Sequence, residues 1–495
     1  MTGCDVIVVG GGNAGLCAAL AAGEREARVL LLERAPAAER GGNSFFTAGA
    51  FRFPYGGVED VTALVDDPLL RSPEHLQIGE YPEEEFYQDL VRVTKSRTDP
   101  ALARAVTAQA FPTMAWLRGH GVEFVLAYDR QSYMVGGKPR FWGGLIVKTK
   151  GEGAGLVNTL YQACQKTGVA VQYGSRATAL RWDSAAHLWA VEAMTDGRSR
   201  LYRARAVVLA SGGFEADPEM RVAHLGPVWR LAKVRGTPYN TGDGIKMGLM
   251  AGARACGDWS GCHAVAWDAN APACNERRVS QHYERDSYPL GVYVNLRGER
   301  FIDEGEDFRN YTYARCGQEI IRQPRQMAFQ IFDQKVVPLL KTPYTLPDAT
   351  WIEASTWAEL ARKAGIEAPT CERTLAAFNA SVNNQPFNPA VKDGKAALGI
   401  RPPKSNWAQP LDAPPYVCFP VTCGITFTFG GLKIAPDAQV LDVRNEPLPG
   451  LFACGELVGG LFHHNYLGGS GLTAGAVFGR LAGVGATAVA GGITR

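Results

Sequence analysis

The sequence predicts an α/β fold built on a parallel sheet of the Rossmann type. Asp5–Val9 is expected to be a buried strand, residues 10–15 a glycine-rich turn, and Leu16–Ala22 a helix of small residues. A second strand, Arg28–Leu32, ends at Glu33. Glycine supplies 57 of the 495 residues, well above an average of roughly 7%. A strand, a glycine turn, a helix and a second strand in this order are typical of a doubly wound sheet.

The glycine turn has the spacing of a pyrophosphate-binding loop. Gly10, Gly12 and Gly15 form G-x-G-x-x-G. The first glycine permits the turn, the second lets the backbone approach a pyrophosphate, and the third lets helix and strand pack closely. Glu33 follows Gly15 by eighteen positions, which suits a carboxylate that accepts hydrogen bonds from ribose hydroxyls. A bound dinucleotide is therefore expected.

Composition excludes several classes of protein. The net charge is only +2 and 46% of the residues are hydrophobic, so intrinsic disorder and a nucleic-acid partner are not expected. The eleven cysteines form no C-x-x-C or C-x-x-C-H pattern, which argues against a metal centre, an iron–sulfur cluster or attached haem.

The two ends of the chain predict a cytoplasmic protein without a membrane span. The first apolar run, Val6–Val9, is too short for a signal peptide and no basic region precedes it. The weakly polar stretch Gly471–Ile493 follows a glycine-rich loop and contains Arg480, so we expect a buried terminal helix there.

A second glycine cluster identifies a family. Gly41-Gly-Asn-Ser44 comes after Glu33 and before Thr47–Ala50, and in this arrangement it resembles the flavoproteins related to fumarate reductase, succinate dehydrogenase and aspartate oxidase. The resemblance implies that the dinucleotide is FAD and that Gly42 and Ser44 lie on it. Members that bind flavin covalently carry a histidine in this segment. Gly41–Phe51 contains none, so the FAD is expected to be non-covalent.

Further segments resemble the cofactor-binding elements of the same family. They are the strand and glycine pair of Val207–Phe214, the Thr241-Gly-Asp-Gly244 turn, the strand with a carboxylate in Gly450–Glu456, and Asn465–Thr473 before a final helix. The start of that helix can direct amides at the pyrimidine edge of reduced flavin. The expected FAD contacts are Gly10, Gly12, Asn13, Ala14, Gly15, Glu33, Arg34, Gly41, Gly42, Asn43, Ser44, Ala48, Gly49, Ala177, Ser211, Gly212, Asp243, Gly455, Glu456, Ser470, Gly471 and Leu472.

The change in composition along the chain predicts a discontinuous FAD-binding domain. From residue 257 to residue 415 the sequence becomes aromatic and is punctuated by proline, and glycine-rich sequence of the dinucleotide type then resumes. We therefore expect a Rossmann-like FAD-binding domain formed by residues 1–256 and 416–495, with an inserted α+β capping domain at 257–415.

Within the family, the chain resembles most the FAD-dependent tricarballylate dehydrogenases and the flavin portion of the precorrin-forming protein of cobalamin synthesis. The motifs behind this are Gly41–Ser44, Tyr81–Phe86, Arg300–Thr312, and Asn465-Tyr466 ahead of Gly468-Gly469. Leu467 departs from the proline usual in this group.

Two differences from fumarate reductases argue against plain fumarate or succinate chemistry. The arginine that grips a substrate carboxylate before Leu-Gly-Gly is replaced by Tyr466. The histidine usual before the next glycine pair is missing from Ile425–Phe429.

Three catalytic residues are expected. By resemblance, Arg309 occupies the position of the proton-transferring arginine and His263 that of a substrate-binding histidine, while Tyr466 would donate a hydrogen bond from its phenol. Arginine is a poor free base, so Arg309 would need a carboxylate partner, for which Glu304, Glu306 and Asp307 are the candidates.

Three classes of function follow. The leading one is an oxidoreductase that desaturates or reduces a carbon–carbon bond next to a carboxylate and exchanges electrons with a separate acceptor. The alternative is a ketone desaturase resembling ketosteroid or cyclohexanone dehydrogenases, which Tyr466 favours. The third is a non-catalytic flavin-binding electron-transfer subunit.

Overall fold

A six-stranded sheet with the strand order β19-β20-β12-β1-β2-β8 forms the centre of the larger lobe. All its neighbouring strands are parallel except β19 and β20. In this computed structural model, which describes residues 3–279 and 281–491, the predicted Rossmann-type sheet is confirmed. The strands are β1 (Val6–Val9), β2 (Val29–Leu32), β8 (Ala170–Gln172), β12 (Ala206–Leu209), β19 (Gln439–Leu441) and β20 (Pro447–Ala453).

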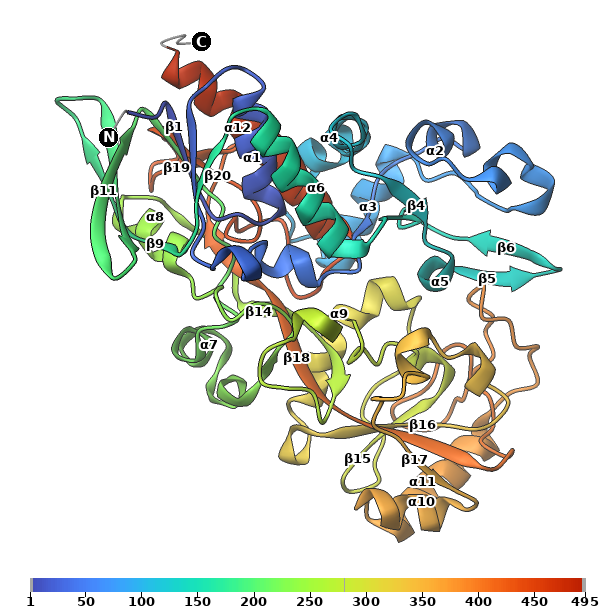
Figure 1. The fold of residues 1–495 in the computed structure, drawn as a ribbon. Helices are drawn as coiled ribbons and strands as arrows, with labels where there is room; N and C mark the ends of the chain where they lie inside the picture. The colour runs from blue at the N-terminus through green and yellow to red at the C-terminus, as the bar shows by residue number, and fades with distance from the viewer. Residues whose placement is uncertain (1–2, 280, 492–495) are drawn as a thin grey trace.

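Helix α1 (Asn13–Gly23) packs against both α6 (Glu152–Lys166) and α12 (Ser470–Ala490), and α1 and α12 contact the strands of this sheet (Figure 1). Among the described helices, only α12 is long and apolar enough to cross a membrane. More than half of it is buried, and a Cβ atom on its Gly479 would overlap the carbonyl of Ala14 in α1. This close packing is that of a core helix in a folded protein.

The rest of the larger lobe surrounds the sheet with smaller elements. An antiparallel sheet of β9, β10 and β11 lies near the N-terminus, and helices α2, α3 and α4 lie at the opposite end (Figure 1). The elements are β3 (Ala50–Phe51), β4 (Phe124–Leu126), β5 (Ser132–Val135), β6 (Lys138–Phe141), β7 (Val147–Thr149), β9 (Ser175–Asp183), β10 (Leu188–Thr195), β11 (Arg198–Ala204), α2 (Val58–Leu64), α3 (Glu83–Val93), α4 (Pro100–Gly119), α5 (Tyr128–Gln131), α7 (Pro218–Leu225) and α8 (Asp243–Met250).

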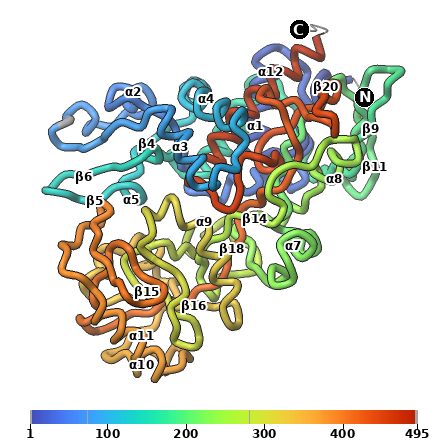
Figure 2. Tube along the Cα trace, turned by 180° about the vertical axis from the view of Figure 1, so that it is seen from behind, coloured from blue at the N-terminus to red at the C-terminus, as the bar shows by residue number. Residues whose placement is uncertain are grey.

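The second lobe is built on the sheet β13-β18-β16-β15, with β14 and β17 also paired to β18. The elements are β13 (Lys233–Val234), β14 (Ala255–Asp268), β15 (Val292–Asn295), β16 (Ala328–Phe332), β17 (Ile352–Ala354), β18 (Tyr416–Leu432), α9 (Arg309–Ile320), α10 (Trp357–Ala364) and α11 (Ala368–Ser381). The long strand β18 runs from this lobe into the larger one, which both views show (Figures 1 and 2). The domain division at residues 256 and 415 stays a prediction.

Candidate active site

A long cavity lies at the carboxyl ends of β1, β2, β12 and β20 and extends toward the second lobe. Its lining includes the residues that follow these strands and side chains from β14, α9 and β18. The carboxyl ends of parallel strands are where open α/β sheets bind ligands. The cavity therefore occupies the place that the glycine motifs predict for a dinucleotide.

Most of the residues expected to contact FAD line this cavity. They are Gly10, Gly12, Asn13, Ala14, Glu33, Arg34, Gly42, Asn43, Ser44, Ala48, Ala177, Ser211, Gly212, Asp243, Gly455, Glu456, Gly471 and Leu472. The residues come from segments far apart in the sequence. Their assignment as FAD contacts stays a prediction, and the structure brings them together in one cavity.

Four of the expected contacts are not part of the lining, and each has a structural role instead. A Cβ on Gly15 would overlap the carbonyl of Gly10, so this glycine serves the packing of α1 on the turn. Gly41 and Gly49 have φ angles of 107° and 68°, which favour glycine, and both are packed against neighbouring residues. Ser470 is fully buried, and its hydroxyl donates to the carbonyl of Leu467 at 2.5 Å.

The phosphate-binding loop fits a dinucleotide. Gly12 precedes the first residue of α1 and has no side chain that could cap this helix, and Gly12, Asn13 and Ala14 line the cavity. The Asn13 amide donates to the Ser44 hydroxyl at 3.0 Å, which joins the two glycine clusters. The buried Ser211 hydroxyl in the same lining has no partner among the described residues. The hydroxyls of Ser44 and Ser211 are donors of the kind that a pyrophosphate requires.

Glu33 is buried at the end of β2 and faces the cavity. Its carboxylate accepts hydrogen bonds from the amides of Gly11 (2.9 Å) and Ala35 (2.8 Å). Burial raises the pKa of Glu33, and these amide bonds oppose the rise. Two bonds leave acceptor capacity on both oxygens for ribose hydroxyls, because an ionised carboxylate has about four acceptor sites.

Replacing Glu33 with glutamine is expected to raise the dissociation constant of FAD by about ten- to a hundredfold. The substitution keeps the size of the side chain but removes a charged acceptor, and such a hydrogen bond is worth about 1.5–3 kcal/mol. Titration of the apoprotein with FAD, followed by flavin fluorescence, measures the change. The exposed Glu59→Gln serves as the control. Wild-type affinity in the Glu33 variant would remove this residue from the ribose site.

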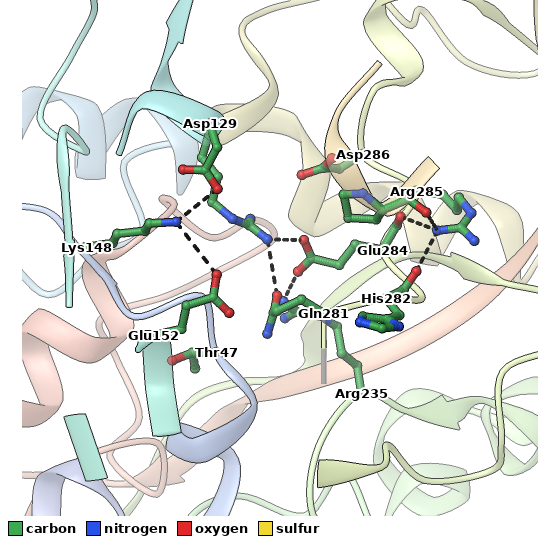
Figure 3. A network of polar contacts seen from close by, with 12 residues as sticks. Thr47, Asp129, Lys148, Glu152, Arg235, Gln281, His282, Glu284, Arg285 and Asp286 are labelled. Atoms are coloured by element: carbon green, nitrogen blue, oxygen red, sulfur yellow. Dashed lines mark hydrogen bonds and ion pairs between the residues drawn. The ribbon is translucent and has the colours of Figure 1, made fainter. Parts of the chain in front are cut away.

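The three expected catalytic residues also line the cavity. Arg309 is the first residue of α9, and its Nη1 donates to Asp286 Oδ2 at 2.6 Å while Nη2 donates to the Arg130 carbonyl at 3.2 Å. Arg130 Nη2 in turn donates to Glu284 Oε2 at 2.6 Å, and Arg235 pairs with the other oxygen of Glu284 (Figure 3). Three arginines and two carboxylates thus form one network beside the cavity.

The charges of this network are fixed. Although burial opposes it, Arg130 and Arg235 lower the pKa of Glu284 to about 2, so this carboxylate stays ionised near neutral pH. Asp286 offsets the burial of Arg309 and raises the pKa of that guanidinium. With three cations and two anions, these five side chains carry one net positive charge toward the cavity.

The carboxylate partners expected for Arg309 are wrong. The residues between 303 and 308 form the loop ahead of α9, and its carboxylates face other partners. Glu304 binds Arg300 and the Tyr293 amide, Glu306 pairs with Arg315, and Asp307 pairs with Arg92. Arg309 instead reaches Asp286, which lies in the segment before β15.

His263 and Tyr466 stack on each other with ring centroids 4.5 Å apart and an angle of 12° between the rings. Burial lowers the pKa of His263 well below its usual value and nearby Arg235 adds to the effect, so the imidazole is neutral. Its Nε2 has no hydrogen-bond partner among the described residues. The Tyr466 hydroxyl accepts a bond from the Gly471 amide at 2.8 Å. Both side chains can therefore offer a hydrogen bond to a ligand.

Sequence reasoning missed several polar residues of the lining: Arg130, Arg235, Tyr239, Asn240, Glu284, Asn310, Tyr313 and Thr426. Some had signals. Glu284 and Asp286 flank Arg285, and Asn310 follows Arg309 directly. No local pattern indicates Arg130, because it lies in a short helix of the larger lobe and contacts Glu284 only in the folded chain.

Comparison with known proteins gives consistent matches. The family model described as an FAD binding domain matches residues 5–472. The chain is 28% identical to a probable fumarate reductase of Shewanella frigidimarina, over 97% of this chain and 74% of that protein. It is similar in structure to the open conformation of a flavocytochrome c3 fumarate reductase, with a TM-score of 0.73, 26% identity, and 98% and 78% of the two chains covered.

A 3-ketosteroid dehydrogenase of Rhodococcus jostii RHA1 shares the fold, with a TM-score of 0.71, 24% identity, and 98% and 96% of the two chains covered. In the described residues, no group of three histidine, cysteine, aspartate or glutamate side chains is placed to hold a metal ion.

Proposed function

The chain belongs to the FAD binding domain family, and from this we propose that it desaturates, or in reverse reduces, a carbon–carbon bond next to a carboxylate. The general activity follows from its relatives: the protein is an FAD-dependent oxidoreductase that acts on carbon–carbon double bonds. The observation that supports a carboxylate substrate is the network of Arg309, Arg130 and Arg235, whose net positive charge faces the cavity.

Bound FAD would supply the site that accepts or returns a hydride during such a reaction. The residues present would hold it through the glycine turn, Glu33 and the start of α12. The chain itself must move a proton on the neighbouring carbon and bind the carboxylate. We propose that Arg309 relays the proton to Asp286: the guanidinium gives one of its own protons to Asp286 Oδ2, 2.6 Å away, and takes up the proton from the substrate carbon, and the reverse transfer returns it. The arginines would polarise a carboxylate bound beside them and make that proton more acidic.

The resemblance to tricarballylate dehydrogenases favours a substrate with several carboxylates, and Arg130, Arg235 and Arg309 line the cavity where these groups would bind. The test is anaerobic spectrophotometry of the FAD-loaded protein with tricarballylate, succinate or a cyclic ketone. Loss of the oxidised flavin spectrum with tricarballylate is expected. If tricarballylate leaves the spectrum unchanged, the proposed substrate is wrong.

A ketone desaturase is the second candidate, and one contact favours it. The Tyr466 hydroxyl accepts the Gly471 amide at 2.8 Å in the cavity lining, which leaves its own O–H group to donate to a substrate oxygen. Such a donor would stabilise an enolate formed from a ketone. Loss of the oxidised flavin spectrum with the cyclic ketone, and not with either carboxylate, would favour this candidate. No observation favours a non-catalytic role.

We also propose that FAD is held non-covalently, because Gly41–Phe51 offers no histidine. Acid precipitation should leave the yellow colour in the supernatant. A pellet that keeps the colour would refute this proposal.

We further propose a cytoplasmic protein with a separate electron acceptor. All eleven cysteines are free thiols, which suits a reducing compartment.

A further inference from the structure

A group of buried polar side chains lies behind the wall of the cavity, where the ends of β12 and β20 meet β18. Glu215 is fully buried and does not line the cavity, whereas Asn43, Asn240 and Glu456 do. Thr428 of β18 completes the group. The two glutamates play no part in the proposed reaction.

Glu215 connects two separate parts of the cavity wall. Its Oε1 accepts hydrogen bonds from Asn43 Nδ2 at 2.5 Å and from Asn240 Nδ2 at 2.7 Å. Asn43 belongs to the second glycine cluster, and its own Oδ1 accepts the Thr237 amide at 2.9 Å. One oxygen of Glu215 therefore fixes two side-chain amides that face the cavity.

Glu456 lies next to Glu215. Its Oε1 accepts the Thr428 amide at 2.8 Å, and its Oε2 is 3.5 Å from the same Asn240 Nδ2 that binds Glu215. The two carboxyl groups are neighbours, because Asn240 Nδ2 is 2.7 Å from Glu215 Oε1 and 3.5 Å from Glu456 Oε2. Oε2 of Glu215 has no hydrogen-bond partner among the described residues.

No cation donates to either glutamate in the part of the chain that the structure describes. Arg221 of α7 is close enough to interact electrostatically with Glu215, but its guanidinium donates to the carbonyls of Ala232 and Arg230. The charged groups on the neighbouring helices are paired elsewhere: Asp217 with Lys246, and Asp243 with Arg34 and Arg176. Two ionised carboxylates in this position would repel each other without compensation.

We propose that Glu215 and Glu456 hold a single proton between them, and that Glu215 is a positioning residue that aligns Asn43 and Asn240 for FAD. The shared proton satisfies Glu215 Oε2 and reduces the charge of the pair from two to one. Burial raises the pKa of Glu456 well above its usual value, and the charge of Glu215 raises it further. The pair therefore keeps its proton to a higher pH than an exposed glutamate would.

The proton makes FAD binding depend on pH. The pyrophosphate of FAD is negatively charged, so it binds better when the pair carries one charge than when it carries two. As the pH rises through the pKa of the pair, the apoprotein loses the proton, and binding must take it up again. The apparent affinity then falls by up to about tenfold per pH unit, the limit for one linked proton.

Glu215→Gln tests the shared proton. The amide oxygen can still accept from both asparagines, and its N–H group replaces the proton toward Glu456 at every pH. The FAD dissociation constant of the wild-type protein is expected to rise as the pH becomes alkaline, while that of Glu215→Gln stays constant. Calorimetry in buffers of different ionisation enthalpy should detect uptake of up to one proton at alkaline pH in the wild-type protein alone. A constant wild-type affinity, or the same rise in the variant, would overturn the shared proton.

Glu215→Ala tests the positioning role. Loss of the shared acceptor should raise the FAD dissociation constant by about ten- to a hundredfold at every pH. The exposed Glu219→Gln on α7 is the matched control and should bind FAD as the wild type does. Wild-type affinity in Glu215→Ala would refute the positioning role. If that variant does not fold, Asn43→Ala and Asn240→Ala take its place, and wild-type affinity in both would refute it equally.

Discussion

Replacement of Arg309 by lysine should lower the rate of flavin reduction by substrate about a hundred- to a thousandfold, with FAD still bound. Lysine keeps the positive charge but cannot donate to Asp286 and to the Arg130 carbonyl at once from a planar group. The loss of one preorganised donor at a reacting centre costs a factor of this size. Because Arg309 does not contribute to the glycine turn, the affinity for FAD should change little.

Anaerobic stopped-flow absorbance at saturating substrate measures the Arg309→Lys effect directly. Arg315→Lys is the matched control, because Arg315 lies on the same helix but pairs with Glu306 away from the cavity lining. A normal rate of reduction in Arg309→Lys would mean that another residue transfers the proton.

Local patterns are why much of the cofactor site could be predicted from the sequence. Gly10, Gly12 and Glu33 are separated by short, fixed distances along β1, α1 and β2, so their spacing reports their positions in space. The segment around Ser44 is assigned through its resemblance to a flavoprotein family, and its hydroxyl accepts the amide of Asn13, the first residue of α1.

The position of the last helix could also be predicted from a local pattern. A terminal helix was expected over Gly471–Ile493, and α12 runs from Ser470 to Ala490. Ile493 lies outside the described residues.

Other parts of the cavity wall depend on contacts that no local pattern reports. Arg130 and Glu284 are 154 positions apart, and Asn43 and Glu215 are 172 positions apart. Sequence neighbours were a misleading guide for Arg309, because the loop before α9 directs its carboxylates to Arg300, Arg315 and Arg92. In a charged stretch the choice of ion-pair partner is made by the tertiary fold, since several partners are equally near along the chain.

Replacement of Tyr466 by phenylalanine separates the two candidate reactions. The variant keeps the stacking on His263 but loses the hydroxyl that accepts the Gly471 amide at 2.8 Å. If the substrate is a ketone, this hydroxyl stabilises the enolate, and its loss should slow flavin reduction about a hundred- to a thousandfold. If the substrate is a carboxylate bound by the arginines, the loss should be smaller than that of Arg309→Lys.

The control for this experiment is Tyr293→Phe, which removes a buried phenol hydroxyl in β15 that is outside the cavity lining and binds Gln330. Tyr293→Phe should lower the stability of the protein without changing the rate of flavin reduction per folded molecule. The comparison therefore separates the effect of the Tyr466 hydroxyl on the reaction from the general cost of losing a buried hydroxyl. Both Tyr466→Phe and Arg309→Lys are then measured on whichever substrate bleaches the flavin. The larger defect identifies the group that carries the developing charge, and near-normal rates in both variants would exclude both proposed reactions at this end of the cavity.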